Sequence, residues 1–140
     1  MILFCDTSAL IKLVVEEAGS DQISSAANGA ETLAVCRIAW AEAMAALAQR
    51  SRIQGANQSE LQQARQTFID CWNDFAIVEV TQPLVEKAGI YADGFALRGS
   101  DSVQLAAAHT LQQELNVPMT FACFDHRLSR AAELLQLEVL

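Results

Sequence analysis

The chain has 140 residues, of which 52% are hydrophobic and 19% are charged, and its formal net charge is −8. A chain of this length and apolar content can bury one core without disulfides or a structural metal, so these values exclude a disordered chain. The net negative charge also argues against binding of nucleic acid, because phosphate contacts come mostly from Lys and Arg. Local charge matters more than the total, however, so a basic region could still bind phosphates.

Short apolar runs alternate with segments of helical periodicity along the chain. The runs predict buried strands, at residues 2–5, 32–36, 76–80, 119–124 and 137–140. The segments between them predict helices, at residues 8–17, 20–28, 37–52, 59–74, 83–97, 102–115 and 127–135. This alternation is typical of a parallel sheet covered by helices on both faces. We therefore expect a single α/β domain with a parallel β-sheet of four to five strands.

Several polar residues and glycines predict where helices begin and end. Ser20 and Ser59 suit helix N-caps, and Pro83 suits a first helical turn. Gly99 predicts a break in the helical pattern.

The cysteines show neither a C-x-x-C pair nor a metal-ligand spacing, and they are Cys5, Cys36, Cys71 and Cys123. We interpret them as free thiols, which indicates a reducing cytoplasm. The first apolar run ends at Asp6 and lacks a preceding basic segment, so we expect neither a signal peptide nor a membrane span.

Glu42 is the single charge in the apolar, alanine-rich segment 38–48. Its neighbours three and four positions away are all apolar, and these are the positions that share its helix face. A carboxylate on such a stripe is costly unless it is paired, so we interpret Glu42 as part of a site. The alternative is a carboxylate that turns outward or pairs with Arg37 or Arg98.

Asp6 and Asp125 each follow an apolar run directly, at the carboxyl ends of two predicted strands. Open α/β sheets bind ligands at that edge. Each aspartate also fits the N-cap of the next helix, and Asp101 with Gln104 resembles a capping box. Together with Glu42, however, the aspartates predict a cluster of carboxylates suited to Mg²⁺ or Mn²⁺ and to phosphodiester chemistry.

The sequence resembles PIN domains, most closely the VapC-type toxins. The shared motifs run from end to end in a fixed order: Ile-Leu-Phe-Cys-Asp6-Thr-Ser-Ala-Leu, Trp-Ala-Glu42, Leu-Arg-Gly-Ser-Asp101-Ser-Val-Gln-Leu-Ala-Ala-Ala and Thr-Phe-Ala-Cys-Phe-Asp125-His-Arg-Leu-Ser-Arg-Ala-Ala. Their order and spacing carry the specificity, since each motif alone is commonplace. The resemblance implies that residues 1–140 form one PIN domain that cleaves RNA endonucleolytically with Mg²⁺ or Mn²⁺, leaving a 5′-phosphate and a 3′-hydroxyl.

The resemblance also assigns roles. It makes four residues the catalytic and metal-binding carboxylates: Asp6, Glu42, Asp101 and Asp125. Ser8 matches a hydroxyl that supports the first aspartate. Cys123 departs from the family, which commonly carries Thr or Ser there, so hydrogen-bond support of Asp125 falls to Thr120 or another group. Gln104, where related toxins often have His, is not expected to alter the chemistry.

Four basic residues lie near the acidic motifs and are candidates to hold the RNA backbone: Lys12, Arg98, Arg127 and Arg130. The alternative is that they belong to solvated helix faces and ordinary ion pairs.

The resemblance further implies a cognate small antitoxin as partner and a homodimer, for which the helices at 37–74 offer apolar surface. Two other functions stay open. One is a PIN-domain nuclease that processes RNA and is not a toxin. The other is a catalytically silent module whose acidic cluster receives a basic segment of a partner. A haloacid-dehalogenase-like phosphatase is disfavoured because Asp6-Thr-Ser8 lacks its second aspartate.

Overall fold

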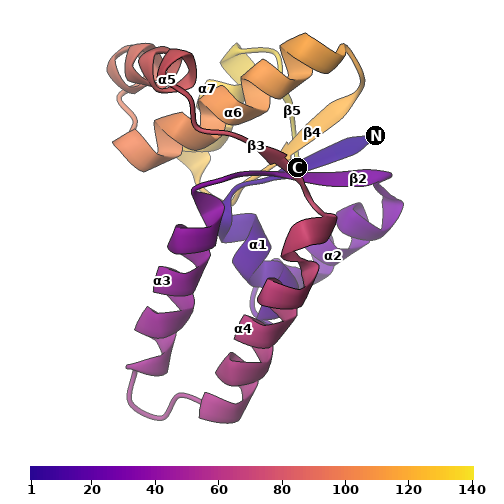
Figure 1. Cartoon of the computed structure of the whole chain (residues 1–140), viewed down its shortest axis with the longest axis vertical. Coiled ribbons are helices and arrows are strands. Elements are labelled where there is room, and N and C mark those ends of the chain that lie inside the picture. Colours follow the sequence, from indigo (N-terminus) through magenta and orange to yellow (C-terminus); the bar gives the residue numbers. More distant parts are fainter.

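Five parallel strands form one sheet in the order β3-β2-β1-β4-β5 (Figure 1). The computed structural model describes every residue from 1 to 140. The strands are β1 (Ile2–Cys5), β2 (Thr32–Cys36), β3 (Ala76–Val78), β4 (Met119–Ala122) and β5 (Glu138–Val139). The predicted parallel sheet is therefore confirmed, with β3 and β4 ending two residues earlier than expected.

Seven α-helices connect and cover the strands. They are α1 (Thr7–Val14), α2 (Ser20–Gly29), α3 (Ala39–Ser51), α4 (Gln58–Cys71), α5 (Gln82–Phe95), α6 (Gly99–Leu115) and α7 (His126–Leu134). A short 3₁₀ helix, Trp72–Asp74, follows α4. Every predicted helix is present. None of them is both long and apolar enough to cross a bilayer.

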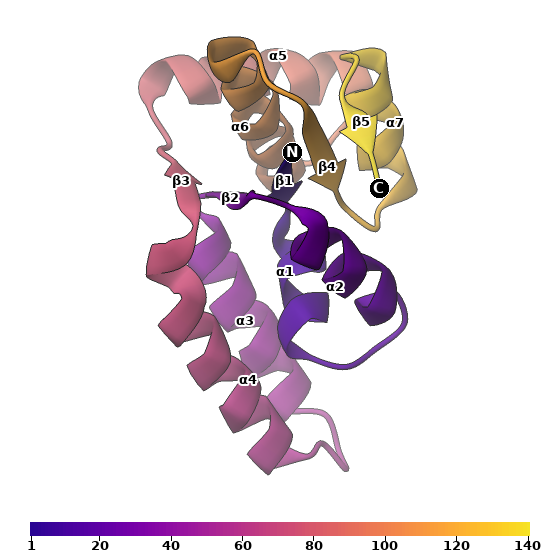
Figure 2. The same cartoon turned by 90° about the vertical axis from the view of Figure 1, so that its right-hand side faces the viewer.

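The side chains of each strand alternate between two cores. Phe4 and Ala34 pack on the side covered by α5, α6 and α7, whereas Leu3 and Val35 pack on the side covered by α1 to α4. Figures 1 and 2 show these layers above and below the sheet, with α3 and α4 extending away from it as a helical hairpin. The apolar character of the strands on both faces is explained by this double coverage.

Three of the residues predicted to set helix boundaries do not act as expected. Gly19, not Ser20, is the N-cap residue of α2, and Ser20 is the first residue of that helix. Asn57, not Ser59, caps α4, because its side chain accepts a hydrogen bond from the backbone N–H of Glu60 at 3.1 Å. Gly99 begins α6 instead of breaking the chain before it, so the helix starts three residues earlier than expected. Pro83 does lie in the first turn of α5.

The strands added after β1 lie on both sides of it, so the order of strands reverses direction at β1. From β1 the chain continues to β2 on one side, and it later returns to β4 on the other side of β1. Such a switch point separates the loops that follow neighbouring strands and leaves room for a ligand. Asp6 follows β1 and Asp125 follows β4 at the carboxyl edge of the sheet.

Candidate functional site

A pocket of about 700 Å³ lies at the carboxyl edge of the sheet, and all four predicted carboxylates line it. Asp6 comes from the loop after β1, Glu42 from α3, Asp101 from α6 and Asp125 from the loop after β4. The fold therefore brings together residues that are up to 119 positions apart in the sequence. Convergence of the four acids at one pocket agrees with the expectation from the sequence.

Asp6 is the most buried of these acids, with 5% of its surface exposed. Its Oδ1 accepts hydrogen bonds from the Ser8 hydroxyl at 2.6 Å and from the backbone N–H of Ala9 at 3.0 Å. The pKa of Asp6 is raised from 3.8 to about 6. Burial is the main cause, and the charges of Asp101 and Glu42 add to the rise, whereas the hydrogen bonds from Ser8 and Ala9 oppose it. The N-cap interpretation of Asp6 is confirmed, and it leaves the site interpretation open, because the cap occupies one oxygen only.

Asp125 is likewise an N-cap residue, on the exposed side of the pocket. Its Oδ1 accepts a hydrogen bond from the backbone N–H of Leu128 at 2.9 Å and so caps α7. Its other oxygen accepts no hydrogen bond from the protein. The cap fixes the carboxylate at the rim of the pocket without saturating it.

Glu42 is held by two side chains that the sequence did not point to. The Thr7 hydroxyl donates to Oε1 of Glu42 at 3.0 Å, and Nε2 of Gln104 donates to the same oxygen at 2.8 Å. Arg37 instead pairs with Glu79 on the surface. The expected alternative for Glu42, a pair with Arg37 or Arg98, is therefore wrong.

Asp101 lies in the first turn of α6 and is not a helix cap. Arg98 is the N-cap residue, but its side chain makes no capping hydrogen bond. Its Nε donates instead to Oδ2 of Asp101 at 3.1 Å. The capping-box interpretation of Asp101 and Gln104 is therefore wrong. The helix extends back to Gly99, which moves both side chains inside it, one turn apart on the face toward the pocket.

The four carboxylates share one pattern: one oxygen accepts hydrogen bonds from the protein and the other accepts none. The engaged atoms are Oδ1 of Asp6, Oε1 of Glu42, Oδ2 of Asp101 and Oδ1 of Asp125. None of the four remaining oxygens is buried without a partner. Each side chain thus offers one accessible anionic oxygen, which is the kind of donor that Mg²⁺ and Mn²⁺ take. No three acidic, cysteine or histidine side chains are close enough to share one ion directly. An ion bound in this arrangement would have to keep some of its water ligands.

Ser8 ties the two central loops of the site together. Besides donating to Asp6, its hydroxyl accepts a hydrogen bond from the backbone N–H of Phe124 at 3.1 Å. Cys123, by contrast, makes no hydrogen bond to the carboxylate of Asp125: its Sγ lies 2.9 Å from Oγ of Ser129 and 3.7 Å from the backbone oxygen of Asp125. Cys123 therefore does not take the place of a supporting hydroxyl, and the backbone N–H of Leu128 supports Asp125 instead.

Two basic side chains, Lys12 of α1 and Arg50 of α3, line one side of the pocket. Glu17 accepts a hydrogen bond from Nζ of Lys12 at 3.2 Å, and its two carboxylate oxygens accept from Nη2 of Arg50 at 3.2 and 3.0 Å. Nζ of Lys12 also lies 4.9 Å from the centre of the Phe124 ring. Gly19 lets that ring approach, because a Cβ at its position would lie 2.7 Å from Phe124. Two cations are thus held beside four carboxylates.

The predicted basic residues divide into two groups. Lys12 and Arg98 line the pocket, whereas Arg127 and Arg130 do not, and Arg127 donates to the backbone oxygen of Ala96. The sequence missed Arg50, which lines the pocket from the end of α3. Its spacing of eight residues from Glu42 puts both side chains on one face of α3, and that signal could have found it.

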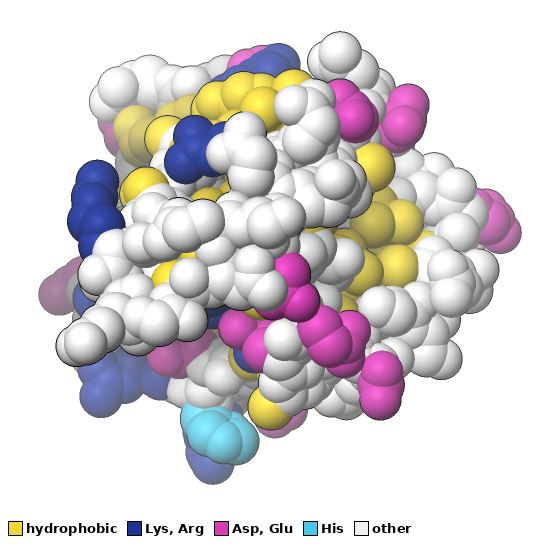
Figure 3. All heavy atoms as spheres, turned by 90° about the horizontal axis from the view of Figure 1, so that it is seen from below, with side chains coloured by type: hydrophobic (Ala, Val, Ile, Leu, Met, Phe, Trp, Pro, Cys, Tyr) yellow, Lys and Arg dark blue, Asp and Glu magenta, His cyan; other side chains and the backbone are white.

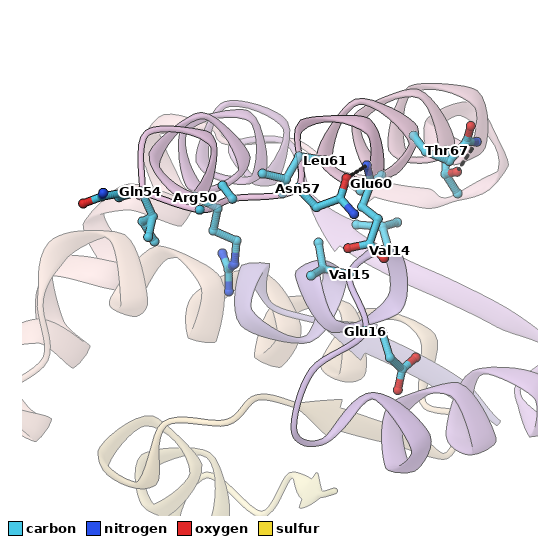
Figure 4. Close-up of a pocket in the computed structure, with 14 residues that line it drawn as sticks. Val14, Val15, Glu16, Arg50, Gln54, Asn57, Glu60, Leu61 and Thr67 are labelled. Carbon is cyan, nitrogen blue, oxygen red and sulfur yellow. Dashed lines mark hydrogen bonds between the residues drawn. The ribbon is translucent and has the colours of Figure 1, made fainter.

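A second pocket of about 550 Å³ adjoins the first, and Arg50 lines both. It lies between the end of α1 and the α3–α4 hairpin, and it is lined in part by apolar side chains. Figure 4 shows Val14 and Val15 directed from α1 toward the hairpin, where Leu61 lies. This pocket contains no predicted site residue.

Comparison with known proteins agrees with the resemblance seen in the sequence. The PIN-domain family matches residues 3–134. Two curated Mycobacterium tuberculosis proteins, "Ribonuclease VapC45" and "Ribonuclease VapC49", are each 34% identical to this chain over 131 residues, which is 94% of the chain and 89% of the relative.

Solved structures share the fold at lower identity. The crystal structure of VapC20 from Mycobacterium tuberculosis, described as a Sarcin-Ricin loop cleaving toxin, superposes with a TM-score of 0.66 at 17% identity, covering 92% of this chain and 94% of that one. VapBC2 from Rickettsia felis, bound to a promoter DNA fragment, gives 0.64 at 13% identity over 100% and 98% of the chains. Because the family match and the 34% identical relatives span nearly the whole sequence, the chain belongs to the PIN-domain family and, within it, to the VapC-type proteins.

Proposed function

We propose that the protein is a Mg²⁺- or Mn²⁺-dependent endoribonuclease and the toxin of a toxin-antitoxin pair. The observation that carries this proposal is the set of four carboxylates around one pocket, each with one anchored and one accessible oxygen. The names of the similar proteins, ribonucleases of the VapC type, support RNA as the substrate.

Asp6, Asp101 and Asp125 are the main candidates to hold the ion, and Glu42 to bind it or to orient the attacking water. When bound, a divalent ion lowers the pKa of a coordinated water and offsets the charge that develops at phosphorus. Ser8 keeps Asp6 oriented and, through its charge-assisted hydrogen bond, favours the ionised carboxylate that a metal requires. The caps on α1 and α7 hold the two aspartates rigidly.

Lys12, Arg50 and Arg98 are our candidates for contact with the RNA backbone. All three line the pocket, and only Lys12 and Arg50 share the carboxylate of Glu17. Seen from the tip of the α3–α4 hairpin, Lys and Arg side chains gather mostly along the left of the molecule, while Asp and Glu lie at the lower centre and right (Figure 3). A protein with net charge −8 can therefore still present a basic edge to phosphates.

The partner in this proposal is a small antitoxin protein. The solved structures that share the fold include one described as a toxin-antitoxin complex, from Klebsiella pneumoniae. We assign an apolar segment of the antitoxin to the second pocket, because Val14, Val15 and Ile53 line it and Ile53 is 61% exposed. A segment seated there would lie beside Arg50 and thus beside the carboxylates.

Two further expectations belong to the same proposal. The cysteines are free, and three of them are buried, as expected for a protein of the reducing cytoplasm. We expect a homodimer, for which α3 and α4 offer the exposed side chains of Trp40 and Ile69.

Inducible expression in a bacterial host tests the proposal. Wild-type protein should stop growth and cut RNA, and Asp6→Asn, produced at the same level, should do neither. Co-expression of the antitoxin encoded beside the gene should restore growth. Wild-type protein that cuts RNA in extracts without slowing growth would instead favour an RNA-processing nuclease, and equal harmlessness of both proteins would contradict the proposal.

A further inference from the structure

Gln104 is the one group in the pocket with a buried polar atom that lacks a hydrogen-bond partner. Its residue surface is 2% exposed, and its Oε1 is the single buried side-chain oxygen or nitrogen of the protein that has no partner. Buried polar groups are almost always hydrogen-bonded, and leaving one unpaired is unfavourable. The orientation of this amide must therefore be set by something other than its own oxygen.

Glu42 sets that orientation. Nε2 of Gln104 donates to Oε1 of Glu42 at 2.8 Å and to Oγ1 of Thr7 at 3.3 Å. Turning the amide over would place its acceptor oxygen against the acceptor oxygen of the carboxylate. Since a hydrogen bond to an ionised group is roughly twice as strong as a neutral one, the orientation that serves Glu42 is preferred even though Oε1 of the amide is left unpaired.

The same contacts join the segments that carry three of the carboxylates. Thr7 follows Asp6 directly, Glu42 belongs to α3, and Gln104 lies one turn after Asp101 on α6. The link between Gln104 and Thr7 spans 97 positions of sequence. A single buried network thus fixes how far α1, α3 and α6 stand from one another at the pocket.

We propose that Gln104 is a positioning residue for Glu42: its amide anchors Oε1 of Glu42 and leaves Oε2 available in the pocket. The inference rests on the proposed function, because it concerns how that site is kept ready for an ion. Gln104 acts through Glu42 and not on RNA, since the unpaired amide oxygen is closed off from the surface.

The test compares Gln104→Met, which keeps the length of the side chain but removes the amide, with wild type. The matched control is Gln113→Met, an exposed position farther along α6 whose side chain contacts Lys87. Titration calorimetry with Mn²⁺ on full-length protein freed of metal should show binding about 10-fold or more weaker in Gln104→Met, a loss typical of partners that orient metal ligands. The control should bind as wild type does. In RNA cleavage, Gln104→Met should lower kcat and leave KM unchanged.

Each other outcome decides against the inference. Wild-type Mn²⁺ affinity and kcat in Gln104→Met would overturn it and leave the ribonuclease proposal standing. A raised KM at normal Mn²⁺ affinity would show that Gln104 contacts RNA instead. If Gln104→Met fails to fold, Gln104→Leu decides, because it removes the same hydrogen bond to Oε1 of Glu42. Wild-type affinity in that variant overturns the inference. Absence of Mn²⁺ binding by wild-type protein would contradict the proposed function and this inference together.

Discussion

Ser8 and Asp6 are joined by a hydrogen bond of 2.6 Å in which the hydroxyl donates to Oδ1 of the carboxylate. Ser8 at the same time accepts from the backbone N–H of Phe124, so one hydroxyl orients the buried acid and joins the loops after β1 and β4. Burial raises the pKa of Asp6 to about 6, and the bond from Ser8 opposes that rise. The ionisation of Asp6 near neutral pH therefore depends on Ser8.

Ser8→Ala should shift the acid limb of the RNA-cleavage pH profile to higher pH. Removal of the hydroxyl raises the pKa of Asp6 further, and metal binding requires the ionised carboxylate. The profile should be measured under saturating Mg²⁺ with Ser59→Ala, an exposed serine far from the pocket, as control. Acid limbs that coincide in wild type and Ser8→Ala would contradict this role.

Asp6 should also govern how metal-free stability varies with pH. Its folded pKa of about 6 lies above the ordinary value of 3.8, so its stabilising contribution is complete below that value and is lost as pH rises through about 6. At about 1.4 kcal/mol per pKa unit, the loss is on the order of 3 kcal/mol. The side chain in Asp6→Asn cannot ionise, so the stability of this variant should not show that loss.

Urea unfolding in EDTA measures this effect. The free energy of unfolding of Asp6→Asn minus that of wild type should grow steadily between about pH 4, near the ordinary pKa of 3.8, and the folded pKa of about 6, and should level off above it. A difference that stays constant over this range would show that the folded protein does not hold the proton on Asp6.

The order of strands and helices could be predicted from periodicity, because the central strands β1, β2 and β4 are buried on both faces and therefore read as continuous apolar runs. Asp6 and Asp125 could be placed because parallel strands end at the same edge of a sheet. Their two interpretations could not be separated by sequence, since an N-cap uses one carboxylate oxygen and leaves the other for a ligand.

Gln104 could not be found in this way. Its role depends on contacts with Thr7 and Glu42, which lie 97 and 62 positions away, and on burial that the local pattern around it does not reveal. Arg50 could have been found from its spacing to Glu42 on α3, but its pairing with Glu17, which joins α3 to the loop after α1, could not. Long-range contacts of this kind are decided by tertiary packing, whereas caps and strand ends are local.

Arg50→Gln should weaken RNA binding and reduce the slope of log affinity against log salt by about 1, the value for loss of one phosphate contact. Binding is best measured in the Asp6→Asn background, where the RNA stays intact. Arg52→Gln is the matched control, because Arg52 is exposed near the same helix end and lines neither pocket. Equal slopes in the two variants would exclude Arg50 as a phosphate contact.

The thiols near the site should be unreactive in the folded protein. Burial above all raises the pKa of Cys5 to about 12 and that of Cys123 to about 11, so little thiolate forms at neutral pH. A thiol reagent should react quickly with Cys71, which is half-buried, and with all four cysteines only after denaturation. Rapid reaction of Cys123 in native protein would contradict its placement.

Cys123→Ser should retain wild-type cleavage activity, because the thiol contacts Ser129 and not the carboxylate of Asp125. Cleavage of the same RNA by the two proteins, at equal concentration and under saturating Mg²⁺, measures this. A large gain in activity would instead mean that the natural thiol leaves Asp125 poorly supported.

The most direct measurement is cleavage of an end-labelled RNA by purified protein, with Mg²⁺ or EDTA, using wild type and Asp6→Asn. The proposed site predicts cuts with a 5′-phosphate and a 3′-hydroxyl, made by wild type in Mg²⁺, abolished by EDTA and absent in Asp6→Asn. Equal cleavage in EDTA, or by Asp6→Asn, would contradict a metal-dependent site built on these carboxylates.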